Sequence, residues 1–218
     1  MKSMFITFEG LEGSGKSTQV GLLASRLKEK NISLVVTREP GGTRIGEHIR
    51  QITHGRENVD LTAVAESYLM AASRAQHVRE IIRPALNDGN VVICDRFIDS
   101  SLAYQGYGRE LGVETILNLN ELAQDKLMPD VTILLDVSPP VGFSRRNHSD
   151  KIDRLDLQQP DFYQRVYQGY KKIAQKFKER YYVVDSSKPI ESVSKIIWDR
   201  VKREKIPNNK SQVPNKIQ

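Results

Sequence analysis

The segment from Gly10 to Ser17 constrains the fold of this chain more than any other. Its residues follow the spacing G-x-x-x-x-G-K-S, with an apolar run at residues 5–8 directly before it. The apolar side chains of residues 16–30, directly after it, recur on one face of a helix. Glycines let a backbone wrap around a phosphate, and the free N–H groups of a helix N-terminus bind it. The pattern predicts a phosphate-binding loop between a buried strand and a helix.

The rest of the chain alternates short apolar runs with longer helical periods. Further strands are expected at residues 33–37, 91–94, 131–137 and 181–184, and helices at 45–52, 61–86, 111–126, 160–178 and 190–205. Pro84 is expected to kink or end its helix. Continuous apolar strands between helices indicate a parallel sheet covered on both faces. We therefore predict an α/β fold with a five-stranded parallel sheet and a ligand site beyond the carboxyl ends of its strands.

Residues 1–206 carry no repeat and no linker, so we expect one domain. Residues 207–218 are rich in Asn, Pro, Lys and Gln and are expected to be a disordered tail. Hydrophobic residues make up 39% of the chain and charged residues 28%, which is typical of a globular protein. No apolar run is long enough for a membrane span, and the start of the chain lacks the apolar core of a signal peptide. The single cysteine, Cys94, excludes an intramolecular disulfide. A cytoplasmic enzyme or binding protein is expected.

The chain carries 33 Lys and Arg against 27 Asp and Glu, a net charge of +6. This excess favours anionic partners without choosing between a nucleotide, a nucleic acid and a membrane surface. Two of the positive charges, Lys210 and Lys216, lie in the tail. An extended basic stripe with interleaved aromatic residues is absent from the sequence, so a nucleic acid is not the expected partner. A membrane is not expected as a partner either.

The phosphate-binding loop indicates a nucleoside triphosphate as one substrate. Lys16 would neutralise the β- and γ-phosphates, and the Ser17 hydroxyl would ligate Mg²⁺. The other loop residues expected to contact ATP are Gly10, Glu12, Gly13, Ser14, Gly15 and Thr18. The alternative is a glycine-rich turn that only caps a helix. The guanine-reading motif of GTPases has one near match, Asn209-Lys210, which lacks the required Asp. We therefore expect a small phosphotransferase whose second substrate is a phosphate or a hydroxyl.

Charged residues also follow the second and third strands. Arg38 lies beside glycines, as suits bidentate phosphate binding, and Glu39 could hold that arginine in place or bind metal-bound water. A Pro-Gly turn with a solvated ion pair would explain the same residues. Asp95 occupies the position where a carboxylate holds Mg²⁺ or its water, and Arg96 points into the same crevice.

Two further segments carry groups suited to substrate contacts. Ser101, Tyr104 and Gln105 offer the hydroxyl, ring and amide groups that read a base or a sugar, although ordinary helix packing would also explain them. The basic segment at about 142–156 suits a lid that closes over both substrates. The alternative is a solvated basic helix.

Taken together, these segments resemble the bacterial thymidylate kinases, a nucleoside monophosphate kinase family of P-loop proteins. The matching segments are residues 8–17, 37–42, 71–77, 95–106 and 153–156, in the order of the family and across most of residues 3–200. The resemblance implies a three-layer P-loop fold with a short lid. It also implies Mg²⁺-dependent transfer of the γ-phosphate of ATP to dTMP, giving dTDP, by a homodimer.

The resemblance also implies roles for individual residues. The dTMP phosphate would be held by Arg38, Arg50 and Arg96. The thymine edge would be read by Arg74, Ser101 and Gln105. Tyr104 would lie near the sugar and disfavour a 2′-hydroxyl, while Glu12 would contact the 3′-hydroxyl. Arg145 would lie over the adenine, and the lid would act on the transferred phosphate through Arg146, Lys151 or Arg154.

One position departs from the family. Met70 stands where the family usually has a Phe that stacks on thymine, so the flat stacking face is replaced by a polarizable thioether. The acceptor phosphate is already ionised near neutral pH, so no general base is needed. We therefore expect the histidines to be surface or structural residues, namely His48, His54, His77 and His148.

Two other interpretations stay open at this point. One is a kinase of neighbouring specificity, for a deoxynucleoside or another nucleotide, although Arg38 and Arg96 favour a phosphorylated acceptor. The other is a regulatory or nucleic-acid-binding module that uses the loop as an ATP-dependent switch. It predicts salt-sensitive nucleic-acid binding and negligible turnover of monophosphates.

Overall fold

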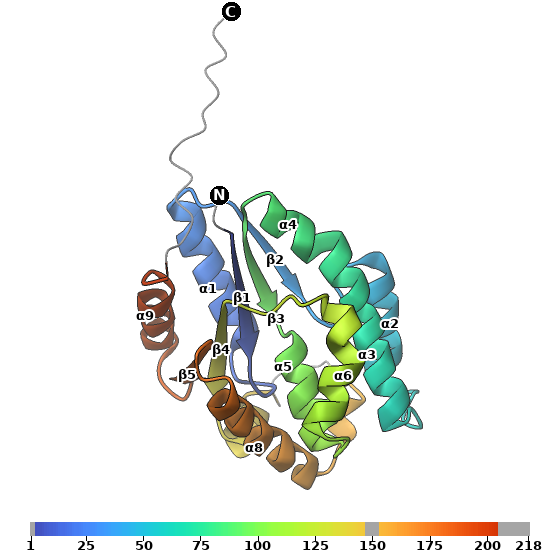
Figure 1. Cartoon of the computed structure of the whole chain (residues 1–218). Helices are drawn as coiled ribbons and strands as arrows, with labels where there is room; N and C mark the ends of the chain where they lie inside the picture. Colours follow the sequence, from blue (N-terminus) through green and yellow to red (C-terminus); the bar gives the residue numbers. More distant parts are fainter. Residues whose placement is uncertain (1–2, 147–152, 205–218) are drawn as a thin grey trace, which may run out of the picture.

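The fold is built on one five-stranded sheet, seen in a computed structural model that describes residues 3–146 and 153–204 (Figure 1). The strands run in the order β2-β3-β1-β4-β5, and every neighbouring pair is parallel. Their bounds are β1 Met4–Glu9, β2 Leu34–Arg38, β3 Val91–Asp95, β4 Val131–Asp136 and β5 Tyr181–Asp185. The predicted α/β fold with a five-stranded parallel sheet is confirmed.

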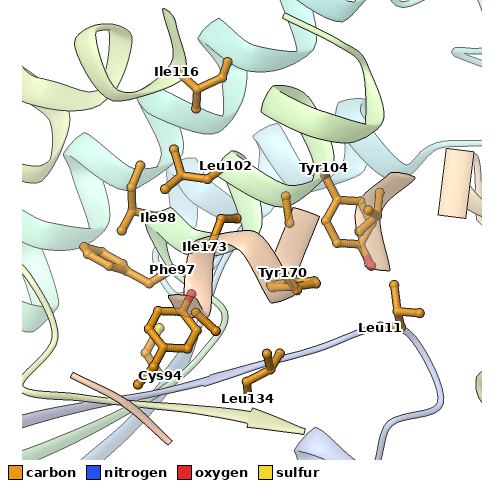
Figure 2. Close-up of a cluster of buried hydrophobic side chains, with 14 of the residues drawn as sticks. Leu11, Cys94, Phe97, Ile98, Leu102, Tyr104, Ile116, Leu134, Tyr170 and Ile173 are labelled. Carbon is orange, nitrogen blue, oxygen red and sulfur yellow. The ribbon is translucent and has the colours of Figure 1, made fainter. Parts of the chain in front are cut away.

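Both faces of the sheet are covered, because successive side chains of each strand point to opposite sides. From β1, Met4, Ile6 and Phe8 join a core beneath α1 (Lys16–Glu29) and α9 (Ile190–Val201). Phe5 joins the opposite core, which Figure 2 shows between the sheet and a second layer of helices. That layer contains α3 Ala63–His77, α4 Arg83–Asn87, α5 Ile98–Ser101, α6 Val113–Gln124 and α8 Pro160–Lys176. The remaining helices near the site are α2 Arg44–His54 and α7 Pro139–Arg146.

The helix predicted at residues 61–86 is interrupted by a wider turn. α3 passes into a π-helical turn, Val78–Ile82, in which the N–H of Arg83 reaches back five residues to the carbonyl of Val78. Pro84 then lies in the first turn of α4. Its missing N–H costs little there, so the helical path continues past the proline to Asn87 instead of ending.

Residues 98–108 form a helical segment that apolar periodicity does not indicate. α5 continues into a second π-helical segment, Leu102–Gly108, in which all residues but Tyr107 are buried. A helix buried on every side shows no amphipathic period, which explains why the sequence pattern carries no signal for it. The segment places Ser101, Tyr104 and Gln105 next to the carboxyl end of β3.

The strand order reverses between β3 and β1, and ligands of such sheets bind at that point. Phe8 pairs with Asp95, and Asp95 pairs in turn with Arg38, so the segments that follow β1, β2 and β3 leave the sheet at one edge. Within the described ranges, no helix is long and apolar enough to span a bilayer. The predicted tail, 207–218, and the centre of the predicted lid, 147–152, lie outside the described residues.

Candidate active site

The loop after β1 turns the chain into α1 through glycines in the left-handed region. Gly15, with φ 90°, precedes the first residue of α1, and Gly13, with φ 73°, lies two positions before Gly15. A side chain on Gly13 would place its Cβ 2.1 Å from the carbonyl oxygen of Gly142 in α7, so only glycine fits this contact. Glycine at these positions allows the tight turn from β1 into α1 and the close approach of α7.

Lys16 is the first residue of α1, and its side chain folds back over this loop and is almost fully buried. Its ammonium donates to the carbonyls of Gly10 at 3.2 Å and Leu11 at 2.9 Å. Burial lowers the pKa of Lys16, and the nearby Arg96 lowers it further, against the opposing effect of Glu12. A buried cation that shares its cavity with another cation favours binding of an anion there.

A second polar pair lies where α1 meets the end of β3. The Ser17 hydroxyl donates to Asp95 Oδ2 at 3.2 Å. The other oxygen, Asp95 Oδ1, is buried and has no hydrogen-bond partner among the described residues. Within the same residues, His, Cys, Asp and Glu form no group of three that could hold a metal. Two hard oxygen donors beside a phosphate loop suit a cation such as Mg²⁺, which takes its remaining ligands from phosphate and water.

Arg96 connects the loop to the segment after β3. Its backbone has φ 71°, a left-handed conformation that is uncommon outside glycine. Its guanidinium donates to Glu12 at 2.6 Å and to Ser100 and Tyr170 at 3.1 Å each, and it lies 5.1 Å from the centre of the Tyr104 ring. These contacts fix a positive charge at the bottom of the crevice.

Two more arginines face the same crevice from β2 and α2. Arg38 donates to both carboxylate oxygens of Glu47 at 2.9 Å, and Arg50 donates to the carbonyl of Pro40 at 3.2 Å. Burial opposes ionisation of Glu47, but the hydrogen bonds that its carboxylate accepts outweigh this effect and lower its pKa. The sequence suggested Glu39 as the partner of Arg38, and this was wrong, because Glu47 reaches it from the first turn of α2.

Glu39 instead lines the adjoining pocket, where it contacts side chains of α3. Its carboxylate accepts from Arg74 Nε at 2.9 Å and lies 3.0 Å from Nδ1 of His77. Arg74 also donates to Ser101 Oγ at 3.1 Å and contacts the amide oxygen of Asn120. Asn120 was not among the predicted site residues, since nothing in the local sequence of α6 relates it to Arg74. The buried His77 belongs to this network, in agreement with the structural role expected for it.

These side chains line two cavities that meet. The first is bounded by the predicted acceptor residues Glu12, Glu39, Met70, Arg74, Arg96, Ser101, Tyr104 and Gln105. The second is bounded by the predicted phosphate and metal residues Glu12, Gly13, Gly15, Lys16, Ser17, Thr18, Arg38, Glu39, Arg50, Asp95 and Arg96. Glu12, Glu39 and Arg96 line both cavities. Two ligands can therefore approach each other at Arg96.

A third cavity opens on the other side of the phosphate loop. Gly13, Ser14, Gly15 and Thr18 line it together with Arg145. Arg145 donates to the carbonyl of Ser186 at 2.9 Å, which ties α7 to the segment after β5. That segment, residues 186–190, also lines the cavity and carried no sequence motif.

Comparison with known proteins identifies the family. A family model described as thymidylate kinase matches residues 8–197. A thymidylate kinase of Geobacillus thermodenitrificans is 47% identical over 195 residues, covering 88% of this chain and 87% of its own length. One from Clostridium novyi is 46% identical over 194 residues, covering 88% and 95%. The crystal structure of thymidylate kinase from Ehrlichia chaffeensis superposes with a TM-score of 0.75 at 36% identity, over 93% of this chain and 99% of that one.

The chain belongs to the thymidylate kinase family. The family and the enzyme class expected from the sequence motifs are thereby confirmed, and so is the P-loop fold.

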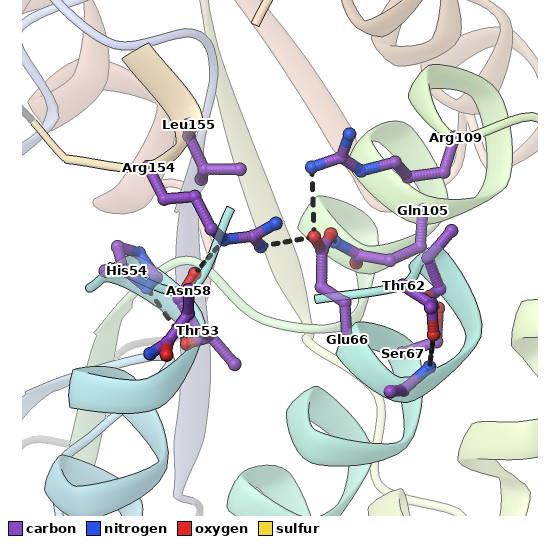
Figure 3. Close-up of polar contacts among 12 residues, drawn as sticks. Thr53, His54, Asn58, Thr62, Glu66, Ser67, Gln105, Arg109, Arg154 and Leu155 are labelled. Atoms are coloured by element: carbon purple, nitrogen blue, oxygen red, sulfur yellow. Dashed lines mark hydrogen bonds and ion pairs between the residues drawn. The ribbon is translucent and has the colours of Figure 1, made fainter. Parts of the chain in front are cut away.

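In the thymidylate kinase motif at residues 153–156, Leu155 lines the first cavity, whereas Arg154 lies against α2 and α3. Arg154 is 1% exposed, and its Nε donates to the carbonyl of Thr53 at 2.9 Å. Its guanidinium also contacts the buried carboxylate of Glu66 (Figure 3). Arg154 lines neither of the two cavities that meet at Arg96.

The other lid residues predicted from the thymidylate kinase resemblance are described only in part. Arg146 is the last residue of α7, and its side chain lies outside the described part of the structure, as does Lys151. Glu66 was not predicted as a site residue. A signal was present, because Glu66, Met70 and Arg74 recur every four residues along one face of α3.

Proposed function

We propose that this protein transfers the γ-phosphate of ATP to dTMP, giving dTDP, for the synthesis of dTTP. The observation that carries the proposal is the meeting of the two cavities at Arg96, in a chain of the thymidylate kinase family. One cavity is lined by the phosphate-binding loop at residues 10–17, the P-loop, as in a triphosphate site. The other is a pocket with hydrogen-bonding groups suited to a base.

The phosphate of dTMP would bind to Arg38, Arg50 and Arg96. The donor and the acceptor are both polyanions, so their mutual repulsion is the main obstacle to in-line approach. Three guanidinium groups and Lys16 around one cavity offset that repulsion and orient both phosphates. The acceptor oxygen is already ionised, so no side chain needs to remove a proton from it.

The thymine ring would occupy the pocket beside Met70. Arg74, Ser101 and Gln105 would read its polar edge. Tyr104, held beside Arg96, would lie near the sugar and disfavour a 2′-hydroxyl, and Glu12 would contact the 3′-hydroxyl.

The Mg²⁺ ion expected with ATP fits the residues present. Asp95 Oδ1 is a buried acceptor without a partner among the described residues, and the Ser17 hydroxyl lies next to the same carboxylate. These two groups would hold the ion or its waters. When bound, the ion supplies positive charge to the phosphates.

The loop residues from Gly10 to Thr18 would hold the ATP phosphates, and Arg145 would cover the adenine in the third cavity. Positive charge from the lid, by Arg146 or Lys151, would assist the transfer. Arg154, the third lid residue expected from the sequence, is held by Glu66 and the carbonyl of Thr53 outside both cavities. We further propose that the protein works as a cytoplasmic homodimer, with neither a nucleic acid nor a membrane as partner.

The proposal is tested by ADP release from ATP and Mg²⁺ with dTMP, dUMP, UMP, dCMP, dGMP and thymidine offered separately. We expect a strong preference for dTMP, no turnover of thymidine, and loss of activity when Mg²⁺ is chelated. Arg96→Ala should lower kcat/KM by about 10²-fold or more. The matched control is Arg79→Ala, at an exposed arginine that lines neither cavity, and it should retain activity. Absence of turnover with every monophosphate would refute the proposal.

A further inference from the structure

Glu66 connects the base pocket to the buried Arg154 and the partly buried Arg109. It lies on α3 with its carboxylate fully buried. One carboxylate oxygen accepts from Gln105 Nε2 at 2.7 Å. The other accepts from Arg109 at 3.0 Å and from Arg154. Figure 3 shows this carboxylate between the two guanidinium groups, with the side chain of Gln105 beside it.

The contacts of Glu66 determine its charge. Burial alone would raise the pKa of Glu66, but Arg109, Arg154 and Gln105 together hold it below its usual value. Glu66 is therefore a carboxylate in the folded protein. An ionised carboxylate accepts hydrogen bonds and donates none.

This charge determines the orientation of the Gln105 amide. Only the NH₂ group of Gln105 can face an acceptor, so its carbonyl oxygen, Oε1, must point away from Glu66. Oε1 has no hydrogen-bond partner in the described part of the chain, and Gln105 lines the base pocket. The pocket thus presents the carbonyl oxygen of Gln105, a hydrogen-bond acceptor. A glutamine that could rotate freely would present its NH₂ group, a donor, equally well.

We propose that Glu66 is a positioning residue that sets base specificity, by holding Gln105 so that its carbonyl oxygen accepts from a ring N–H of the acceptor base. The inference rests on the proposed function. Thymine and uracil carry a hydrogen on ring nitrogen N3, whereas N3 of cytosine is an acceptor. Gln105 therefore attracts the first two bases, and two facing lone pairs reject the third.

Substitution Glu66→Gln tests this role directly. An amide at position 66 can present either its oxygen or its NH₂ group to Gln105, so the orientation of Gln105 is no longer determined. We expect the ratio of kcat/KM for dTMP over dCMP to fall about tenfold or more, mainly through the two KM values, because one hydrogen bond to the base is at stake.

The matched control is Arg109→Gln. It removes one arginine from the ion-pair network, while Arg154 and Gln105 still contact the Glu66 carboxylate. A specificity role predicts an unchanged dTMP to dCMP ratio for Arg109→Gln. A merely structural role of Glu66 predicts that both variants lose stability and keep the dTMP to dCMP ratio of kcat/KM. An unchanged ratio in Glu66→Gln would therefore overturn the proposal.

The double variant Glu66→Gln/Gln105→Glu provides a rescue. A carboxylate at position 105 presents an acceptor in either orientation, and the amide introduced at position 66 can donate to it. The preference for dTMP over dCMP should return to within about threefold of the wild-type value. A double variant no more selective than Glu66→Gln would contradict the proposal.

Binding to the unmodified protein gives a test that does not depend on the folding of a variant. We expect 3-methyl-dTMP, which lacks the N3 hydrogen, to bind at least about tenfold more weakly than dTMP in a competition assay. Equal binding would show that Gln105 presents no acceptor to N3. If the wild-type protein does not phosphorylate dTMP at all, the proposed function fails first. Turnover of dTMP with an unaltered ratio in Glu66→Gln refutes the role of Glu66 alone.

Discussion

At the scale of single residues, the site depends on charges held in place by buried partners. Arg96 keeps an uncommon backbone conformation, with φ 71°, while its side chain contacts groups from the P-loop, α5 and α8. A conformation of this kind costs roughly 1–3 kcal/mol, and the surrounding hydrogen bonds must offset that cost. The side chains of Glu12, Ser100 and Tyr170 supply them.

Met70 offers a test of how this protein binds a base. It lines the same pocket as the polar groups, where a flat ring would cover more of the base. Met70→Phe should lower the KM for dTMP by roughly two- to twelvefold, because ring stacking contributes about 0.5–1.5 kcal/mol. Steady-state kinetics with dTMP as the varied substrate measures this. A KM that is unchanged or higher would show that the Met70 thioether binds the base at least as well as a phenyl ring does.

Glu9 predicts a pH dependence of stability. Its buried carboxylate accepts from the Phe97 N–H, the Ser100 hydroxyl and the Tyr170 hydroxyl. Burial, and then the charge of Asp99, raise its pKa from 4.5 to about 7. Between pH 4.5 and pH 7 the folded state binds more protons at Glu9 than the unfolded state does. The stability that protonated Glu9 contributes to the folded state is therefore lost as the pH rises through about 7.

Glu9→Gln stays neutral at every pH and removes this dependence. Relative to wild type, we expect the variant to gain up to about 3 kcal/mol between pH 4.5 and pH 8, measured as the free energy of unfolding in urea. Glu29→Gln, at an exposed position on α1, is the control. A difference between Glu9→Gln and wild type that is the same at both pH values would contradict the raised pKa.

At the scale of elements, the P-loop and α7 touch through their backbones. A Cβ on Gly142 would lie 2.6 Å from the carbonyl oxygen of Glu12, and a Cβ on Gly13 would lie 2.1 Å from the carbonyl oxygen of Gly142. The contact requires glycine on both sides. It places α7, which carries Arg145, directly against the loop that binds the ATP phosphates in the proposed function.

Gly142→Ala should separate these two elements. We expect the KM for ATP to rise about tenfold or more, with a smaller change in the KM for dTMP, because the pocket around Met70 lies on the other side of the loop. Both constants come from initial rates. The control is Gly21→Ala on α1, where a Cβ meets nothing within 4 Å. It should add about 0.5–1 kcal/mol of stability and leave both constants unchanged. Equal behaviour of the two variants would show that the contact has no influence on the loop.

At the scale of the whole molecule, the sheet brings three strand ends to one crevice, and α3 leaves large apolar side chains exposed. α3 carries Val64 and Tyr68 one turn apart, 54% and 63% exposed. Ala72, one turn further, is also exposed. Large apolar side chains in such a row are typical of an interface between subunits. The proposed homodimer would use this apolar row.

Val64→Glu/Tyr68→Glu should therefore convert the proposed dimer to a monomer, because it places charges at the centre of the row. Sedimentation velocity of the full chain measures the change, and circular dichroism shows that the variant is folded. Glu121→Gln on the exposed side of α6 is the control. A variant that remains dimeric would place the interface elsewhere, and a monomeric wild-type protein would refute the proposed homodimer.

Local patterns in the sequence were enough to predict the sheet, the phosphate loop and the family. Strands buried on both faces appear in the sequence as continuous apolar runs. The phosphate-binding loop needs glycines, Lys16 and Ser17 at fixed spacing. Neighbouring residues are therefore enough to predict both. The helical segment at residues 98–108 was missed because burial on all sides removes its periodicity. Of the two outcomes expected at Pro84, a kink or an end of the helix, the end is wrong, because a π-helical turn, which local propensity does not signal, places the proline in the first turn of α4.

The pairing of charges, in contrast, is visible in the folded structure alone. Arg38 pairs with Glu47 rather than Glu39, Glu39 with Arg74, and Glu66 with Arg154, 88 positions away. Ion pairs of this kind depend on distances between separate elements and on the exclusion of water, neither of which leaves a local pattern in the chain. Most of the residues around the crevice could therefore be predicted from the sequence. The fold determined which of them face the cavities and which hold their neighbours in position.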